Sequence, residues 1–317
     1  MLTAASLAPS SVCVVIPMYN AAGSIRQTLD SLSEQTRRPD HVIVIDDGSS
    51  DAGPQIVADY AASFPLTLLR QANEGPASAR NKGVFRSEET FIAFLDADDQ
   101  WHPQKLEKQL ALHEELCRLG HSVGLIDCDV LIEYSNGTRQ VEDRHKCGRH
   151  FDDFIHANIV NGTSTVLVLR EVVVALGGFD PSLHYAEDRL LWTRIAEYWE
   201  IHTVPQVLVR REISSGNITA QPKKYYPHKV RFIELYLARY GEVLTRQQRT
   251  HFVLANHAEF LDAFSRRGEH SHVVSVYRRM LEQSWQTLVF CRGKQTLRYL
   301  YARAKTLRKA VESTTAH

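Results

Sequence analysis

Short apolar runs and amphipathic stretches alternate through the first third of the chain. Four runs of β-branched, aliphatic and aromatic residues predict buried strands, because strands covered on both faces carry few polar side chains. These runs are Ser11–Pro17, His41–Asp46, Leu66–Arg70 and Phe91–Leu95.

Between these runs the apolar positions change to helical spacing. Ile25, Leu29 and Leu32 form one stripe of a helix predicted over Asn20–Gln35. Further helices are predicted over Pro54–Ala62, from Asn73 onward, and over Pro103–Leu119, where Trp101 and Pro103 open the helix. Strands that alternate with helices predict an α/β fold with a doubly wound, mostly parallel sheet.

The later pattern is less regular. It predicts a strand over Asn161–Arg170, a tight turn at Gly177–Pro181, an amphipathic helix over Glu187–Glu197 and a strand over His202–Val209; the loop Gln140–Asn161 carries no readable pattern. From Gln221 to His317, helically spaced apolar positions predict a helical appendage; they include Phe232, Leu235, Tyr236, Phe252, Leu261, Phe264, Val273, Val276 and Met280. We therefore expect one domain over residues 1–215, with halves at 11–120 and 121–215, and a helical, basic extension over 216–317.

The composition favours a soluble protein with a sizeable core. Of the 317 residues 44% are hydrophobic, and 37 Lys and Arg balance 37 Asp and Glu, so the net charge indicates no polyanionic partner. The five cysteines are scattered without paired spacing, which favours reduced thiols. The start of the chain lacks a signal-peptide pattern, and no stretch approaches the roughly 20 apolar residues of a membrane span. We expect a cytoplasmic protein.

Two acidic segments follow the second and fourth predicted strands. One is Asp46–Asp51 (DDGSSD), and the other contains Asp96, Asp98 and Asp99. Ligands of doubly wound sheets bind outside the carboxyl ends of the strands, so the two segments are expected to meet in one crevice. Three neighbouring carboxylates favour a hard divalent cation such as Mn²⁺ or Mg²⁺. The alternative is a solvated loop at the N-terminus of a helix.

A nucleoside diphosphate suits this crevice. The chain has neither Gly-x-Gly-x-x-Gly after the first strand nor Gly-x-x-x-x-Gly-Lys-Ser, so the usual dinucleotide and P-loop patterns are absent from the sequence. An acid after the second strand can accept hydrogen bonds from a base or a ribose, and a metal on the later acids can neutralise a diphosphate. Arg80 can donate to the base or the phosphates.

Four segments together resemble a known family. VVIPMYN, VIVIDDGSSD, NEGPASARN and FIAFLDADD occur in the order and spacing of the inverting family 2 glycosyltransferases with the GT-A-type fold, and the resemblance covers Val12–Arg211. It implies that Pro17 and Tyr19 flank the nucleotide, that Asp47 contacts the base, and that Arg80 braces base or phosphate. It also places Asp96 near the ribose and Asp98 on the metal, with Asp99 beside it; Asn20, Asp46 and Ala97 complete the expected nucleotide-sugar-binding set.

Simpler structural roles remain open for three of the polar residues near the donor site. Asp46 can cap its turn, Asp51 can start the next helix, and Asn73 can cap the helix that follows it.

The acceptor side of the resemblance rests on Glu187-Asp188 before Leu191-Trp192. In the family, such an acidic pair carries the general base, which implies Asp188 as the base and Glu187 as its neighbour. Inverting transfer needs one carboxylate to take the proton of the acceptor hydroxyl. The alternative is that both acids merely favour a helix N-terminus. Trp192 is interpreted as a core residue rather than a sugar platform.

The family often places an arginine and a histidine over the phosphates after the following strand. Arg210 and Arg211 are present, and Arg211 is expected at the phosphate. Ile213 and Ser214 stand where the histidine is sought, so a histidine metal ligand is in doubt.

We therefore expect a metal-dependent inverting glycosyltransferase of the hexosyl or N-acetylhexosaminyl type, active in cell-envelope polysaccharide biosynthesis. It would move a sugar from a nucleoside diphosphate donor, with UDP as the expected nucleotide, to a hydroxyl of a glycan, a lipid-linked saccharide or another acceptor. The alternatives are a catalytically silent nucleotide-sugar sensor or scaffold, which has no need of an acidic pair at the acceptor side, and a nucleotidyltransferase, which would carry a glycine-rich phosphate loop.

The C-terminal segment is basic. Between Tyr277 and Lys309, nine Lys and Arg face one acid, Glu282, a net charge of +8. Apolar residues are interleaved with these charges: Trp285, Leu288, Phe290, Leu297, Tyr299, Leu300 and Tyr301. The pattern fits a peripheral contact with the anionic inner face of the plasma membrane. A solvated helix face and a homo-oligomer contact are the alternatives, while nucleic-acid binding is disfavoured because no recognised module accompanies the charge.

Overall fold

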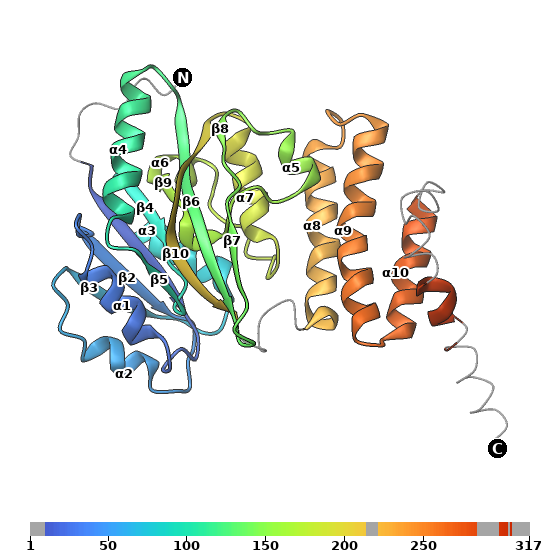
Figure 1. Ribbon diagram of the computed structural model, residues 1–317, viewed down its shortest axis with the longest axis horizontal. Helices are drawn as coiled ribbons and strands as arrows, with labels where there is room; N and C mark the ends of the chain where they lie inside the picture. Colours follow the sequence, from blue (N-terminus) through green and yellow to red (C-terminus); the bar gives the residue numbers. More distant parts are fainter. Residues whose placement is uncertain (1–9, 214–220, 284–297, 304, 306–317) are drawn as a thin grey trace. The chain divides into compact units, whose positions relative to one another are not determined.

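The computed structural model describes residues 10–213, 221–283, 298–303 and 305 (Figure 1). The chain forms two compact units, Met1–Ser215 and Gly216–His317. The first unit contains a single mixed sheet with helices on both faces, and the second contains helices.

The four strands predicted first form the parallel part of the sheet. They are β1 (Val12–Met18), β2 (His41–Asp46), β3 (Leu66–Arg70) and β4 (Phe91–Phe94), in the order β3-β2-β1-β4. All three pairings among them are parallel, so their carboxyl ends share one edge of the sheet. The prediction of a mostly parallel α/β sheet is confirmed for this half.

Helices cover both faces of this sheet, as Figure 1 shows. The helices are α1 (Ile25–Ser33), α2 (Gly53–Ala58), α3 (Pro76–Arg86), α4 (Lys105–Arg118), α5 (Asp153–His156), α6 (Arg170–Ala175) and α7 (Glu187–Ala196). Apolar side chains of α1, α2 and α4 share one core with the strand residues Val14 and Val44. Those of α3, α6 and α7 share a second core with Val15 and Ile45, so successive strand residues serve opposite faces.

The other half of the sheet is mixed. It adds β9 (Leu167–Leu169), β6 (Val123–Tyr134), β10 (Glu200–Ile213) and β5 (Asp99–Trp101), while β7 (Arg139–Glu142) pairs with β6 and β8 (Cys147–Gly148) pairs with β10. β9 runs antiparallel to both β4 and β6, and β10 runs parallel to β6.

Two local predictions were wrong. Trp101 does not open a helix: it ends the short strand β5, and its buried indole Nε1 donates to the carbonyl of Ser164 at 2.9 Å. The strand predicted over Asn161–Arg170 is reduced to β9, with a 3₁₀ turn before it at Thr163–Thr165 and a helix from Arg170. The carbonyls of this turn accept from Trp101 and Gln109 side chains, which replace ladder hydrogen bonds.

The second unit contains α8 (Pro222–Tyr240), α9 (Arg246–Arg266) and α10 (His270–Gln283). Thr245 and Gln248 form a capping box at the start of α9. The rings of Tyr236 and Phe252 stack at 4.1 Å, and the predicted apolar positions on the three helices are buried or half-buried.

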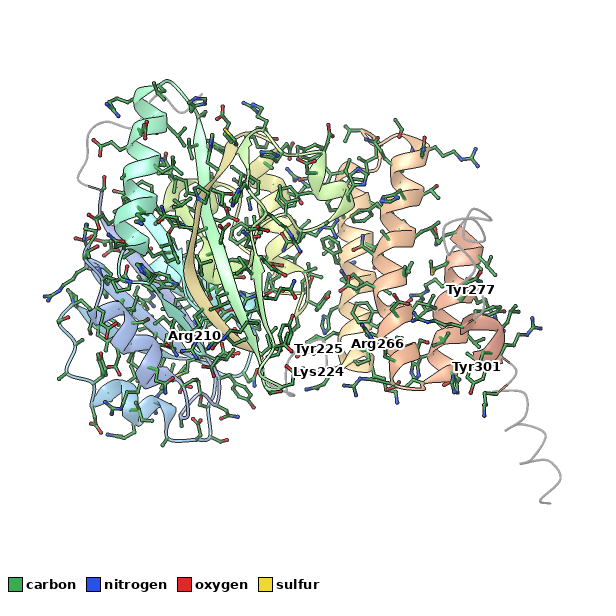
Figure 2. The ribbon with its side chains drawn as sticks, in the orientation of Figure 1. Arg210, Lys224, Tyr225, Arg266, Tyr277 and Tyr301 are labelled. Carbon is green, nitrogen blue, oxygen red and sulfur yellow. The ribbon has the colours of Figure 1, made fainter. Side chains whose placement is uncertain are left out.

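Much of the basic C-terminal segment lies outside the described residues, including Trp285, Leu288, Phe290 and Leu297. In its described part, Tyr277 (Figure 2) is buried and stacks on Tyr299 at 4.2 Å. Leu300 and Tyr301 are exposed. None of the described helices is long and apolar enough to cross a membrane.

Candidate functional site

The central feature of the site is a buried arginine that joins both halves of the first unit. Arg80 lies on α3, and its two terminal nitrogens contact Asp96 Oδ1 at 2.8 Å and Glu187 Oε1 at 3.0 Å. Burial by itself lowers the pKa of the Arg80 guanidinium, but the charges of Asp96 and Glu187 have the larger effect and raise this pKa. Among the described residues its Nε has no hydrogen-bond partner, and the guanidinium lies 5.5 Å from the centre of the Phe179 ring.

The acidic pair Glu187-Asp188 begins α7. Ala186, directly before it, has a left-handed backbone (φ 62°), a conformation that costs about 1–3 kcal/mol for a residue other than glycine. Burial and the Asp188 charge raise the pKa of Glu187 to about 7, against the lowering effect of Arg80. Asp188 is half-buried, and its Oδ2 accepts from Asn158 Nδ2 at 2.9 Å. Its other oxygen accepts from the backbone of Arg189 at 2.7 Å, so this carboxylate is held in one orientation.

The three acids after β4 have different surroundings. Asp96 is fixed by Arg80 and by Ser164 Oγ, which accepts from its backbone N–H at 3.0 Å. Asp99 is buried on β5, and Arg211 Nε lies 3.4 Å from its Oδ2 across the strand pair. Asp98 is the exposed one. Ala97 is held through its carbonyl, which accepts from Ser24 and Thr28 of the α1 region at 2.8 and 3.0 Å.

The residues after β4 fit a hard divalent cation. Asp98 is the most exposed of the three acids, but the surrounding protein still reduces the hydration of its carboxylate; this effect, and then the Asp96 charge, raise the pKa of Asp98. Burial, together with Asp96 and Asp98, raises the pKa of Asp99 to about 7 although Arg211 lowers it. Neighbouring carboxylates contribute to both shifts, and a cation bound among them would offset this repulsion. Carboxylate oxygens are also the ligands that Mn²⁺ and Mg²⁺ prefer. Asp98 is the carboxylate open to an ion, while Asp99 is engaged by Arg211.

The residues at the ends of β1 and β2 organise the neighbouring loops. Asp47 accepts from the backbone N–H groups of Glu74 and Gly75 at 2.8 and 2.9 Å, just before α3, and from Gln71 Nε2 at 2.9 Å. Asp46 accepts from the backbone of Ser49 at 2.9 Å, which is the turn-capping role left open above.

Asp51 and Asn20 hold the adjacent turns. Asp51 accepts from the backbone of Gly53 at the start of α2 and from Ala22. Asn20 has a positive φ of 50°, and its side-chain oxygen accepts from the backbone of Ser50 at 2.9 Å. Tyr19 is exposed and Pro17 half-buried, so both side chains can face a ligand.

The residues at the end of β10 contact different partners. Arg211 contacts Asp99, whereas Arg210 (Figure 2) donates from Nε to Glu133 at 2.6 Å. Ile213 ends β10, and Ser214 lies outside the described residues. Trp192 of α7 is fully buried in the core that α7 shares with α3, α6 and the sheet, which confirms its interpretation as a core residue.

Several residues that position the site were not predicted from the sequence. Asn81 of α3 exchanges two 2.8 Å hydrogen bonds with the backbone of Phe179, and a Cβ on Gly178 would lie 2.3 Å from its side-chain oxygen. Asn81, next to Arg80, and the Gly177-Gly178 pair are visible in the sequence, but no sequence pattern indicates that they pack together.

A second missed group holds the loop at residues 158–162. Buried Asp127 of β6 is paired with Lys146 at 2.7 Å and accepts from the backbone of Asn161 at 3.2 Å. Asn161 Nδ2 donates to the carbonyl of Cys128 at 3.1 Å. The loop thereby presents Asn158 to Asp188, and Gly162, whose φ is +119°, to Arg211.

The chain is similar in sequence to known glycosyltransferases. The sequence model of the family described as "Glycosyl transferase family 2" matches residues 13–142. An uncharacterized glycosyltransferase of Haemophilus influenzae is 28% identical over 177 residues, which are 55% of this chain and 58% of that protein. The amylovoran biosynthesis glycosyltransferase AmsB of Erwinia amylovora is 41% identical over 112 residues, 33% of this chain and 36% of that protein. The chain thus spans less than two thirds of these relatives.

Solved structures share the fold. TarS of S. aureus (residues 1–349, in complex with UDP-GlcNAc) aligns with a TM-score of 0.64 at 19% identity, covering 94% of this chain and 92% of that one. The mannosyltransferase PcManGT of Pyrobaculum calidifontis, in complex with GDP-Man and Mn²⁺, aligns with a TM-score of 0.58 at 20% identity, covering 93% and 86%. At these identities the likeness supports the fold.

Proposed function

Because residues 13–142 match the sequence model of glycosyltransferase family 2 and the fold is similar to that of solved glycosyltransferases, we propose that this chain transfers a sugar from a nucleoside diphosphate sugar to an acceptor hydroxyl. The observation that carries the proposal is Arg80, which holds Asp96 of the donor half and Glu187 of the acceptor half on one guanidinium. A site built in this way brings donor-binding acids and a candidate base into one place. A protein that only binds a nucleotide sugar has no need of the second acid pair.

In the proposed reaction Asp188 is the general base. Its carboxylate takes the proton of the acceptor hydroxyl while that oxygen forms a bond to the anomeric carbon. The bond from the anomeric carbon to the diphosphate oxygen breaks on the opposite side, so the configuration is inverted and the nucleoside diphosphate leaves. The hydrogen bond from Asn158 Nδ2 holds the Asp188 side chain in a fixed orientation for this step.

Asp98, with Asp99 beside it, would hold the divalent cation, which stabilises the charge of the departing diphosphate. Arg211 adds a positive charge next to these acids, and Arg80 keeps Asp96 in place for the ribose. Proposed contacts of the nucleotide are Pro17, Tyr19, Asn20, Asp46, Asp47 and Ala97, which lie at the ends of β1, β2 and β4.

We retain UDP as the proposed nucleotide and a glycan or lipid-linked saccharide as the proposed acceptor. TarS was crystallised with UDP-GlcNAc and PcManGT with GDP-Man, so the shared fold accommodates either nucleotide. We also propose that residues 277–309 contact anionic lipid, because this segment has a net positive charge.

The test is a thermal shift of the purified chain with UDP, GDP, CDP and dTDP, each with and without Mn²⁺. A ligand that binds the folded state raises the melting temperature by mass action. Stabilisation by UDP that requires the metal supports the proposal. Stabilisation by GDP alone would make GDP, not UDP, the nucleotide of the donor. The absence of a shift with every nucleotide at millimolar concentration would contradict donor binding.

A further inference from the structure

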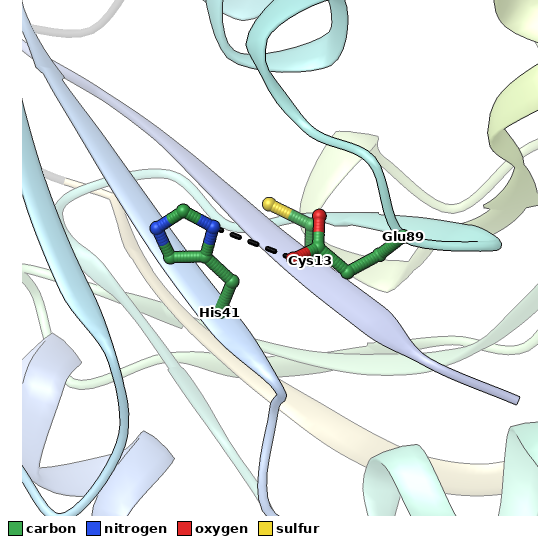
Figure 3. Close-up of side chains that lie close together, drawn as sticks. All are labelled: Cys13, His41 and Glu89. Atoms are coloured by element: carbon green, nitrogen blue, oxygen red, sulfur yellow. Dashed lines mark ion pairs between the residues drawn. The ribbon is translucent and has the colours of Figure 1, made fainter. Parts of the chain in front are cut away.

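Three potential metal ligands meet at the edge of the sheet opposite the donor site. Cys13 is the second residue of β1, His41 is the first of β2, and Glu89 lies in the turn before β4; we call these residues the edge cluster. Cys13 and His41 are direct partners in the parallel register. Because the strands are parallel, their amino ends lie at the far edge from Asp46 and Asp96. Figure 3 shows the sulfur, the imidazole and the carboxylate converging, and their ligand atoms all lie within 4.8 Å of one another.

The distance between His41 and Glu89 in the edge cluster suits two ligands of one ion. His41 Nδ1 lies 3.4 Å from Glu89 Oε1, longer than the about 2.7–3.2 Å of an N–H···O hydrogen bond. Tetrahedral zinc with bonds of about 2.0–2.2 Å places neighbouring nitrogen and oxygen ligands about 3.4 Å apart. A second ion-binding candidate, formed by His121, Glu200 and His202, differs on this point. Both imidazoles there contact Glu200 Oε2 at 2.9 and 2.8 Å, which are hydrogen-bond distances.

The atoms that face away from the centre of the edge cluster are already engaged. His41 Nε2 lies 2.9 Å from Thr67 Oγ1, so a proton on Nε2 can be donated to this hydroxyl and Nδ1 is left with its lone pair free. Glu89 Oε2 accepts from the backbone of Glu88 at 3.0 Å, which leaves Oε1 for the centre. Metal-binding histidines usually donate their second N–H to such an outer partner, which fixes the tautomer.

Cys13 supplies the chemistry that selects the ion. Its side chain is fully buried, and among the described residues its one hydrogen bond is a weak one from Sγ to the carbonyl of Val14 at 3.8 Å. The thiolate is the form of cysteine that binds metals, and a cation beside Cys13 would stabilise this charge in its buried position. Partly exposed side chains of His41 and Glu89 give an ion access from solvent.

We propose that the edge cluster is a Zn²⁺ site with three protein ligands, Cys13 Sγ, His41 Nδ1 and Glu89 Oε1, and a fourth position open to water or an external ligand. A thiolate and an imidazole favour zinc over Mg²⁺ or Mn²⁺, which take oxygen ligands. On binding, the thiol releases its proton to solvent and no oxidant is required. The ion would join β1, β2 and the turn before β4, and would be distinct in chemistry and place from the proposed cation at Asp98.

The test uses the full chain, purified with a chelator and a thiol reductant and then freed of both. Zn²⁺ is titrated against a chromophoric chelator, and Co²⁺ is added separately to record the near-ultraviolet charge-transfer band of a thiolate–cobalt bond. We expect one tightly bound ion per chain and a thiolate–cobalt band. Cys13→Ser should remove that band, and Glu89→Gln should weaken Zn²⁺ binding by at least about tenfold.

Two further variants keep the test independent of folding. Thr67→Val preserves the shape of a half-buried residue and removes only the outer partner of His41, so it should weaken Zn²⁺ binding by about 10–100-fold. His202→Gln, in the other cluster, is the matched control and should leave Zn²⁺ binding unchanged, as should Asp98→Asn. Absence of stoichiometric Zn²⁺, a cobalt spectrum without the thiolate band, or binding that survives both Glu89→Gln and Thr67→Val would each overturn the proposal.

Discussion

Arg80 and Glu187 form a buried ion pair of 3.0 Å although 107 positions separate them in the chain. The same guanidinium contacts Asp96 at 2.8 Å, so one side chain neutralises an acid from each half of the first unit. The pair therefore links the helix after β3 to the first turn of the helix that carries the candidate base. Loss of this link should affect folding and activity together.

Replacement of Arg80 by alanine should destabilise the first unit by about 3–5 kcal/mol, because buried Glu187 and half-buried Asp96 both lose their partner. Arg80→Lys should recover only part of this, since an ammonium group cannot contact both acids in the fork geometry of arginine. The measurement is the free energy of unfolding in urea, with sugar transfer measured on the folded fraction. Arg70→Ala is the control: Arg70 is largely exposed and lies 3.6 Å from Asp46, so about 1 kcal/mol or less should be lost. Equal losses in the two alanine variants would contradict the bridging role.

Asp188→Asn should lower kcat by about 10²–10⁴-fold while leaving the affinity for the donor nucleotide near that of the unchanged chain. The amide keeps the size of the side chain but cannot accept the acceptor's proton. Transfer is measured as released nucleoside diphosphate, and donor affinity by calorimetry. Asp180→Asn, in a turn where Asp180 accepts from the backbone of Ser182 at 2.9 Å, should retain turnover. Turnover retained in Asp188→Asn would remove Asp188 as the base.

Asp98→Asn should abolish the part of nucleotide binding that depends on Mn²⁺, because Asp98 is the exposed acid of the cluster. Asp99→Asn should act differently: this acid is buried against Arg211, so its loss should chiefly lower stability. The measurements are Mn²⁺ titration by electron paramagnetic resonance and thermal unfolding. The surface variant Asp59→Asn serves as the control. Metal-dependent nucleotide binding that persists in Asp98→Asn would place the ion elsewhere.

The parallel half of the fold was predictable because a strand covered on both faces reads as an unbroken apolar run. β2 and β3 were predicted to the residue, and β1 and β4 to within one residue at each end. The missed strand β6 has two acids at its centre. Asp127 there is paired with Lys146, 19 positions later, and Asp129 with His145, so their burial depends on partners that local pattern does not reveal.

The same limit applies to the site. Acids at the ends of β2 and β4 follow from strand pattern and the parallel sheet alone. Other features depend on contacts across the fold. Asp47 accepts three hydrogen bonds from the loop before α3, and acids contact both terminal nitrogens of Arg80. Arg80 was expected at the base or phosphate, and its geometry favours a positioning role.

The helical unit should lose stability in acid through His257. This imidazole is buried, its Nδ1 lies 3.1 Å from the Tyr226 hydroxyl, and burial, together with Arg279 and Lys229, lowers its pKa to about 4. The unfolded chain therefore binds the proton first as pH falls. Stability is fully present above the ordinary histidine pKa of about 6.5 and is lost between there and about 4, at up to about 1.4 kcal/mol per pH unit.

The measurement is hydrogen exchange of α9 amides, corrected for the intrinsic pH dependence of exchange. His257→Gln should flatten the loss of protection below pH 6.5, a window set by the ordinary histidine pKa of about 6.5. His272→Gln, which replaces a partly exposed imidazole beside Glu269, should preserve it. An unchanged slope in His257→Gln would show that other groups govern the acid response.

Gly162→Ala should separate the role of Arg211 from general stability. The backbone at Gly162 has φ +119° and ψ 159°, a region open almost only to glycine, so alanine should cost about 1–3 kcal/mol. A Cβ there would also lie 2.3 Å from a terminal nitrogen of Arg211, which must move away from Asp99. Gly148→Ala is the matched control, because Gly148 has φ +109° with nothing within 4 Å of its Cβ position. Both variants should lower the unfolding free energy, but only Gly162→Ala should raise the donor KM. Equal donor KM values for the two, measured on folded protein, would show that Arg211 does not contact the donor phosphates.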